Sequence, residues 1–228
     1  MGGALPADRM RPVSLAGQRL LPVLPGLDDL LPGRGLRRGS TVAVAGCPSL
    51  ALALLAGPSA AGSWCAAVGL PSLGLVAAAE MGVVLARLAL VPWPGREWAT
   101  VVATLVDALD VVLVAPPARG VPSADARRLV ARCRERGAVL VVAGTWEGAD
   151  LHLAVTEHRW EGLGQGAGHL RARRASVVVR GRGAASHPRR AWLWLPAEGG
   201  GVAPAPPCEL GAKSRAGACD RHTGSPRR

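Results

Sequence analysis

The alternation of short apolar stretches with amphipathic ones between residues 41 and 143 constrains the fold of this chain most strongly. Apolar or β-branched stretches, which favour strands, occupy residues 41–45, 63–69, 88–91, 111–115 and 138–143. Helical periodicity falls between them, at about 49–56, 72–86, 95–108 and 123–136. Strands that alternate with helices form a mainly parallel sheet whose two faces are covered. The sequence therefore predicts an α/β domain with such a sheet.

The pattern changes after Asp150, where LHLAVTEHRWEG, SVVVRGRG and AWLWLP read as strands joined by short loops. Their alternation predicts an antiparallel ribbon added to the edge of the parallel sheet. Residues beyond Pro196 show no apolar period and are expected to be disordered. We therefore expect a lead-in over 1–40 with a short helix after Pro25, a core domain over 41–196 and a basic tail over 197–228.

The segment TVAVAGCPSLALALLAG, residues 41–57, has the strand, glycine and helix of a phosphate-binding loop without its reactive side chains. A working loop places a Lys and a Ser or Thr at the start of the helix, where they bind the terminal phosphates and Mg²⁺. Here Ala51, Leu52 and Ala53 stand where the motif has its second Gly, the Lys and the Ser or Thr, so only Gly46, Cys47 and Ser49 remain as candidates for binding a nucleotide. The alternative is a buried strand and helix with no ligand. We expect no catalysis and no cofactor.

Arginine dominates the positive charge, because 26 of the 27 basic residues are Arg while Phe, Tyr, Ile and Asn do not occur. This skew is typical of a GC-rich genome, so the net charge of +11 overstates the case for nucleic acid. The position of the charge is more informative, since residues 159–190 contain Glu161 as their only acidic residue. The arginines of this stretch, candidates for binding a partner or nucleic acid, are Arg159, Arg171, Arg173, Arg174, Arg180, Arg182, Arg189 and Arg190. A solvated sheet edge is the alternative.

The remaining patterns predict neither a metal site nor a membrane segment. The five cysteines form no C-x-x-C pair, and Cys208, Cys219 and His222 lack both zinc-ligand spacing and a fourth partner. The apolar stretches are far shorter than the roughly 20 residues of a membrane span, and the first residues do not form a secretory signal. We therefore expect a cytoplasmic protein whose cysteines pack in the core.

The order of these motifs resembles the core of the bacterial recombinase RecA, and within that superfamily the actinobacterial ImuA-type accessory proteins of the mutagenic repair cassette. The motifs are LRRGSTVAVAG at 36–46, SWCAAVGLPSLGLVAAAEMGV at 63–83, DVVLVAPP at 110–117, GAVLVVAG at 137–144 and HRWEGLGQGAGHLRARRASVVVRGRG at 158–183. The resemblance covers roughly residues 15–196 and implies a RecA-like, P-loop-type core.

The resemblance also implies a function and shows where this chain departs from the recombinases. The water-orienting Glu and the strand-ending Asp of the ATPase are replaced by Leu70 or Pro71 and by Ala115 or Pro116, and both DNA-contacting loops are short. ImuA-type proteins act beside a Y-family-like polymerase homologue and an error-prone replicative-type DNA polymerase. The resemblance therefore implies a non-catalytic adaptor in DNA-damage tolerance that supports translesion synthesis. The alternatives are a stand-alone nucleic-acid-binding protein that uses the Arg171–Arg190 ribbon and a divergent nucleotide-binding protein.

Overall fold

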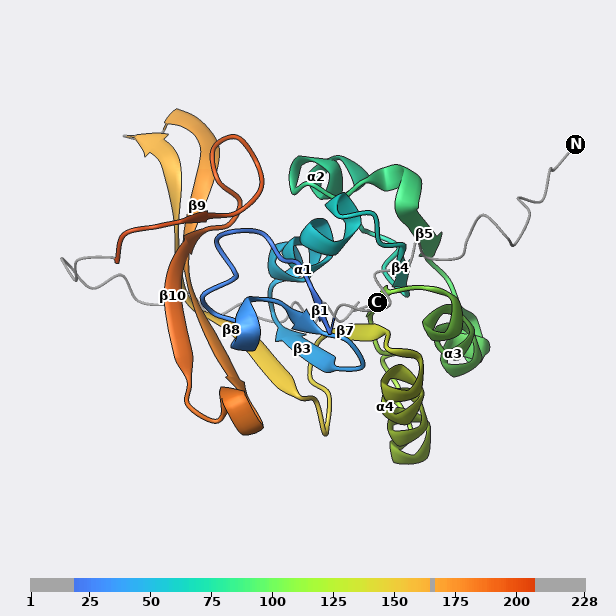
Figure 1. Cartoon of the computed structure of the whole chain (residues 1–228). Helices are drawn as coiled ribbons and strands as arrows, with labels where there is room; N and C mark the ends of the chain where they lie inside the picture. The colour runs from blue at the N-terminus through green and yellow to red at the C-terminus, as the bar shows by residue number, and fades with distance from the viewer. Residues whose placement is uncertain (1–18, 165–166, 208–228) are drawn as a thin grey trace, which may run out of the picture.

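A computed structural model of the chain describes residues 19–164 and 167–207, and it is built on one nine-stranded mixed sheet (Figure 1). The sheet has the order β11-β10-β9-β8-β3-β7-β6-β4-β5. Its strands are β3 (Thr41–Ala45), β4 (Cys65–Val68), β5 (Leu88–Val91), β6 (Val111–Val114), β7 (Val139–Ala143), β8 (Leu151–Gly164), β9 (Ala167–Gly181), β10 (Arg189–Trp194) and β11 (Ala203–Pro204). The six neighbouring strands β8, β3, β7, β6, β4 and β5 run parallel to one another. Strands β9, β10 and β11 continue the sheet beyond β8 in antiparallel pairs.

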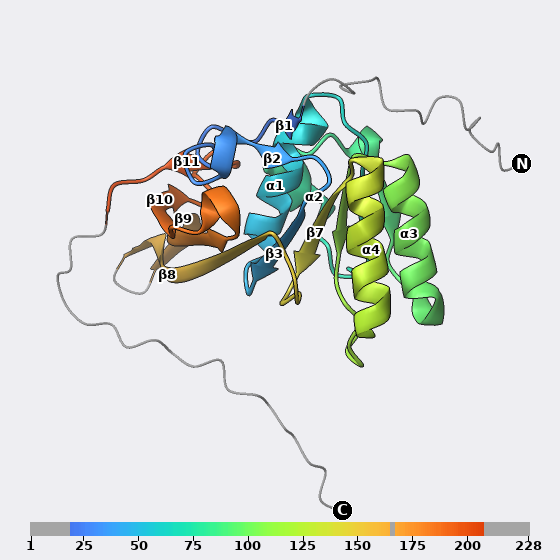
Figure 2. The same ribbon diagram turned by 60° about the horizontal axis from the view of Figure 1, so that its bottom comes forward.

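Helices pack on both faces of the parallel half of the sheet. On one face, α1 (Pro48–Ala60) is buried from Leu50 to Ser59 because its sequence is apolar on every side. On the other face, α3 (Trp98–Ala108) and α4 (Ser123–Arg136) lie side by side (Figure 2). They bury Val102 and Leu129, among others, against β4, β6 and β7. The predicted α/β architecture is confirmed.

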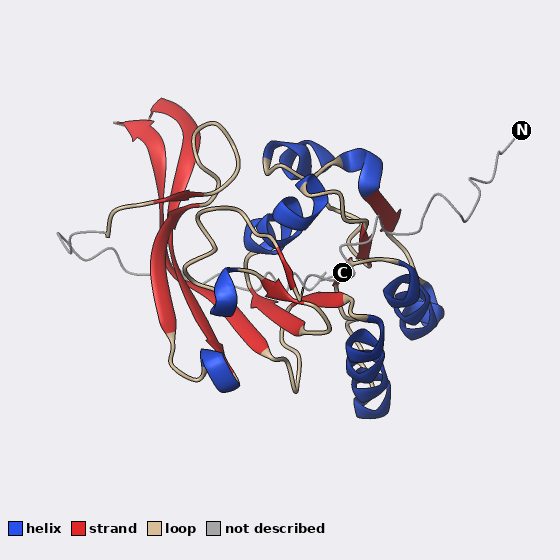
Figure 3. Cartoon of the chain, in the orientation of Figure 1, coloured by secondary structure: helices blue, strands red, loops and turns tan. Residues whose placement is uncertain are grey.

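The antiparallel end of the sheet is built differently. Figure 3 shows α3 and α4 beside the parallel strands, away from β9 and β10. The hydrophobic cluster under α3 and α4 contains Ala43 of β3 but, among the described residues, none from β8 to β10. One face of this ribbon is therefore not covered by that helical layer.

Two predicted boundaries differ from the structure. The helix expected over 72–86 is much shorter, since α2 spans only Leu75–Glu80 and is followed by Gly82 with φ +101° and a 3₁₀ turn at Leu85–Arg87. The sheet also continues beyond the boundary expected at 196, because β11 pairs with Leu193 and Trp194 of β10. Residues 208–228 of the expected tail lie outside the described residues.

The described part of the lead-in packs over α1 without forming the helix expected after Pro25. It contains turns, a 3₁₀ turn at Pro32–Arg34, and two short strands, β1 (Leu20–Leu21) and β2 (Leu36–Arg37). Five of its leucines are nonetheless fully buried in the main core: Leu21, Leu27, Leu30, Leu31 and Leu36. A buried ion pair of 2.9 Å between Arg38 Nη2 and Asp110 Oδ1 joins the end of the lead-in to the start of β6.

Candidate functional site

The turn from β3 to α1 brings Gly46, Cys47 and Ser49 together, as the sequence predicts. Gly46 has φ +66° and no heavy atom near the place of a Cβ. However, Pro48 has no N–H, and the N–H of Leu50 already donates to the Cys47 carbonyl at 3.1 Å. Fewer donors of the helix N-terminus are thus free to bind a phosphate than in an ordinary helix start.

The places that need a Lys and a hydroxyl for nucleotide hydrolysis are apolar and buried. Leu52 and Ala53, which occupy these places, lie in the main core at 5% and 0% exposure. The neighbouring strands end in Gly69, Leu70 and Pro71 after β4 and in Ala115 and Pro116 after β6. This edge of the sheet therefore presents no charged group at those strand ends.

A cavity of about 380 Å³ opens beside these strand ends, between the loops that follow β6 and β7. Its lining includes Pro116, Thr145 and Trp146, with Glu147 as the only carboxylate. One carboxylate supplies neither a general acid–base pair nor a metal site. Across residues 19–164 and 167–207, no cluster of three or more His, Cys, Asp or Glu side chains forms a metal site. The candidates Cys208, Cys219 and His222 lie outside the described residues.

The register of the ribbon divides its arginines between two faces, because directly paired residues of neighbouring strands point to the same side. Arg189 pairs with Val179, which is buried in the core beside α1. Side chains two positions apart on a strand point to the same side, so Arg171 and Arg173 share with Val179 the side of β9 that faces α1. These three arginines were predicted to bind a partner or nucleic acid.

The arginines on the α1 side make contacts within the protein. Arg173 donates from Nε to the Leu195 carbonyl at 2.7 Å and from Nη2 to Cys47 Sγ at 3.0 Å, and its guanidinium lies 5.5 Å from the Trp160 ring. Arg189 donates to the carbonyls of Leu31 and of Asp29, at 3.3 and 3.4 Å.

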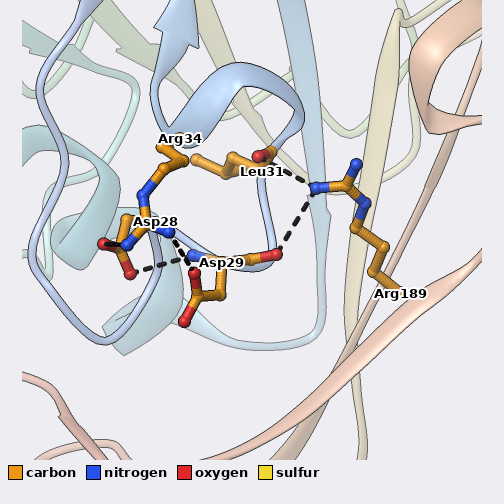
Figure 4. A network of polar contacts seen from close by, with 5 residues as sticks. All are labelled: Asp28, Asp29, Leu31, Arg34 and Arg189. Atoms are coloured by element: carbon orange, nitrogen blue, oxygen red, sulfur yellow. Dashed lines mark hydrogen bonds and ion pairs between the residues drawn. The ribbon is translucent and has the colours of Figure 1, made fainter.

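Figure 4 shows the hydrogen bonds from Arg189 to the lead-in, next to Arg34, which pairs with Asp28 and Asp29. Arg34 is held there at φ +62°, an unusual conformation for a residue other than glycine. Arg189 therefore links the lead-in to β10, and its role in binding a partner or nucleic acid stays a prediction.

Four other predicted arginines lie on the opposite face of the ribbon. Arg159 and Arg174 are directly paired, Arg180 pairs with His152, and Arg190 pairs with Val178. Trp192 and Trp194 lie on this side, since Trp194 pairs with Arg174 and its ring is 5.8 Å from that guanidinium. We call this surface the ribbon face; it consists of His152, Arg159, Arg174, Arg180, Arg190, Trp192 and Trp194, together with the carboxylates Glu157 and Glu161, which pair with Ser176 and Ala172 on the same side.

The last predicted arginine, Arg182, follows the end of β9 and belongs to neither group. It is exposed and lines a separate cavity of about 410 Å³ together with Arg37, Ser40 and Asp150. The Asp150 carboxylate accepts a hydrogen bond of 2.9 Å from the Thr41 N–H and lies 3.5 Å from Arg134. These contacts connect Asp150, which directly precedes β8, to the start of β3 and to the last turn of α4.

Sequence reasoning missed an exposed apolar surface at the far edge of the sheet. Strand β5 is the last strand on that side, and most of the exposed large hydrophobic side chains of the described residues come from the chain around it. They are Leu75, Val76, Val84, Leu85, Leu90 and Trp93. The available signal was Trp93 itself, which stands between two prolines after β5 and is 80% exposed. We call the four that immediately precede, belong to or follow β5, namely Val84, Leu85, Leu90 and Trp93, the β5 edge surface.

Within residues 19–164 and 167–207, none of the helices combines the length and the apolarity needed to cross a bilayer.

Comparison with known proteins gives a family but no activity. Residues 29–148, more than half of the chain, match the family model described as the MT3502 N-terminal domain. The chain is also 42% identical over 129 residues to the uncharacterized protein Rv3395c of Mycobacterium tuberculosis (strain ATCC 25618 / H37Rv). That match covers 55% of this chain and 63% of the relative, so it spans less than two thirds of the relative's length. The chain belongs to the MT3502 N-terminal domain family.

Proposed function

We propose that this protein is a non-catalytic, RecA-like adaptor in DNA-damage tolerance. As the resemblance to ImuA-type proteins implies, it binds a Y-family-like polymerase homologue and an error-prone replicative-type DNA polymerase and so supports translesion synthesis. The observation that carries the proposal is the β5 edge surface, an apolar area at the edge strand of a sheet in which β4 and β6 are followed by Leu70, Pro71, Ala115 and Pro116.

The β3–α1 turn supports the non-catalytic part of the proposal. Nucleotide hydrolysis depends on a Lys that reaches the terminal phosphates, a hydroxyl that holds Mg²⁺ and a carboxylate beside them. In this chain Leu52 and Ala53 are buried at the first two places, and Leu70 with Pro71 follows β4. These independent losses support a protein that does not hydrolyse nucleotide.

The β5 edge surface supports the partner-binding part. An edge strand presents unpaired backbone N–H and C=O groups, which can pair with an extended segment of another protein. Leu90 on the strand is 41% exposed, and Trp93 follows it at 80%. Exposed tryptophans are enriched among the residues that dominate binding energy at interfaces, and clustered exposed apolar side chains mark interaction sites. We infer that a polymerase partner supplies an extended apolar segment here.

Affinity capture from DNA-damaged cells of the native host tests the adaptor role. The tagged full chain is captured after nuclease treatment, which removes DNA bridges, and the proteins retained are identified by mass spectrometry. We expect polymerase-type proteins to be enriched with the unmodified chain and lost with the double variant Leu90→Glu, Trp93→Ser. Leu170→Ser is the matched control, because Leu170 is 52% exposed on β9, away from β5.

Two outcomes contradict the proposal. If no polymerase-type protein is retained by the unmodified chain after nuclease, the adaptor role is wrong. If such a protein is retained equally by the double variant, the partner does not bind at the β5 edge surface.

A further inference from the structure

We propose that the ribbon face binds single-stranded nucleic acid. This inference is independent of the adaptor role, because the ribbon face and the β5 edge surface lie at opposite ends of the sheet. It also depends on neither the β3–α1 turn nor the loops that follow β6 and β7. The protein can therefore hold a nucleic acid and a protein partner on two separate surfaces.

The ribbon face is a grid in which cations flank aromatic rings. Its rows, fixed by strand register, begin with His152 beside Arg180 and end with Arg159, Arg174 and Trp194. Between them lie Arg190 and then the row of Trp192, Ser176 and Glu157. Arg180 and Arg174 are six positions apart, which corresponds to about 20 Å along an extended strand. The surface is long enough to contact several successive nucleotides.

The ribbon face carries four arginines against two carboxylates, Glu157 and Glu161, so positive charge prevails on it. Arg174 lies 3.5 Å from Glu161, and the other three arginines are the groups that fit phosphate. In the described residues, neither Arg159 nor Arg180 forms an ion pair, and both side chains are exposed. Arg190 lies 3.8 Å from Glu157, with both side chains more than half exposed. Such an exposed pair contributes little free energy and can exchange for a phosphate, which guanidinium groups bind in a bidentate manner.

The tryptophans distinguish nucleic acid from an acidic protein segment as the ligand. Trp192 and Trp194 are two residues apart on one strand, so both indoles lie on the same side. Bases of single strands stack on aromatic side chains of this kind whatever their sequence, while nearby cations follow the backbone.

Fluorescence anisotropy of a labelled dT20 oligonucleotide with the full chain tests this proposal. The triple variant Arg159→Ala, Arg180→Ala, Arg190→Ala removes three charges from the ribbon face. We expect it to weaken binding at least tenfold at low salt and to reduce the slope of log K against log salt by about 2. Trp194→Leu should weaken binding severalfold while leaving that slope unchanged, because it removes stacking and no charge.

A control of equal charge separates site binding from general attraction. Arg127→Ala, Arg128→Ala, Arg171→Ala also removes three exposed arginines, from α4 and from the other face of β9. We expect its affinity to stay within twofold of the unmodified chain, and Leu90→Glu, Trp93→Ser should bind dT20 normally.

Each contrary result overturns the inference. Equal weakening by both triple variants means that net charge alone attracts DNA. No binding of dT20, together with loss of a captured protein partner from the ribbon-face triple variant, means that the ribbon face binds an acidic protein instead. No binding of dT20 with capture unchanged means that the ribbon face is a solvated surface. Matching thermal unfolding of the variants excludes misfolding as the cause.

Discussion

The guanidinium of Arg173 donates a hydrogen bond of 3.0 Å to Cys47 Sγ, across 126 positions of the chain. Cys47 is the N-cap of α1 and is 4% exposed. The positive end of a helix dipole does not attract a cation, so this arrangement depends on the second bond from Arg173 to the Leu195 carbonyl. The contact connects β9 of the antiparallel ribbon to the β3–α1 turn, the position of the phosphate-binding loop in P-loop ATPases.

Arg173→Met should destabilise the fold. It removes charged hydrogen bonds to the Leu195 carbonyl and Cys47 Sγ from a half-buried position, and bonds of this type contribute about 1.5–3 kcal/mol. Arg171→Met is the control, because Arg171 is 67% exposed and pairs only with the exposed Glu198. Urea denaturation gives both values. Equal stability of the two variants would show that the Cys47 contact contributes nothing.

Asp110→Ala should be among the most destabilising substitutions in the chain. The Asp110 side chain is 3% exposed, pairs with Arg38 and accepts a hydrogen bond from the Trp64 N–H at 3.2 Å. Removing the carboxylate leaves a largely buried guanidinium without its counter-ion, which costs about 3–5 kcal/mol. Asp125→Ala, which breaks a 3.8 Å pair with the exposed Arg128, should cost less than about 0.5 kcal/mol by the same unfolding measurement.

Gly57→Ala should loosen the lead-in from α1. A Cβ at this helix position would lie 2.5 Å from Val23 Cα and 2.7 Å from the Pro22 carbonyl oxygen. Because both are backbone atoms, the lead-in itself must move, at a cost of about 1–3 kcal/mol. Hydrogen exchange should show faster exchange in residues 20–37. Gly199→Ala has free space around it and should leave exchange unchanged.

Stability should fall with rising pH above about 9 because of two buried thiols. Burial, aided by the charge of Asp110, raises the pKa of Cys65 to about 12, and burial likewise raises the pKa of Cys133 to about 12. Unfolded thiols ionise near the ordinary pKa of 9.0, whereas the folded thiols stay protonated. Their contribution is therefore complete below pH 9 and is lost progressively toward pH 12, by roughly 1 kcal/mol per pH unit for each thiol.

Cys65→Ala separates the thiol from other alkaline effects. The variant has a lower stability at pH 8 because it loses a buried group, but its free energy of unfolding should decline less steeply between pH 9 and 10.5. Parallel curves for the variant and the unmodified chain would exclude Cys65 as a cause of the decline.

Local patterns predicted the parallel half of the fold well, because the spacing of apolar residues differs between its strands and its helices. The helix at Ser123–Arg136 matches the prediction at both ends, since Pro122 precedes it and Gly137, with φ +71°, ends it. The helix expected over 72–86 was wrong because Gly74 and Gly82 interrupt an apolar composition that otherwise favours helix. The strand β11 depends on pairing with β10, a contact that no local pattern reveals.

The sequence predicted which arginines belong to the candidate site, but not which of them share a face of the ribbon. Composition located the arginine-rich stretch, but it could not tell which arginines face outward, because that depends on register across β8, β9 and β10. A bulge between Val155 and Glu157 shifts the alternation of β8 and places Arg159 opposite Arg174. The contacts from Arg173 to Cys47 and from Arg189 to the lead-in are likewise long-range.

Isothermal titration of the full chain with ATP and Mg²⁺ tests most directly whether the β3–α1 turn has lost its ligand. Our account predicts no saturable heat up to millimolar nucleotide, both for the unmodified chain and for Arg173→Met, in which the guanidinium beside Cys47 is removed. Saturable binding in the micromolar range would contradict it and would make the protein a divergent nucleotide-binding protein.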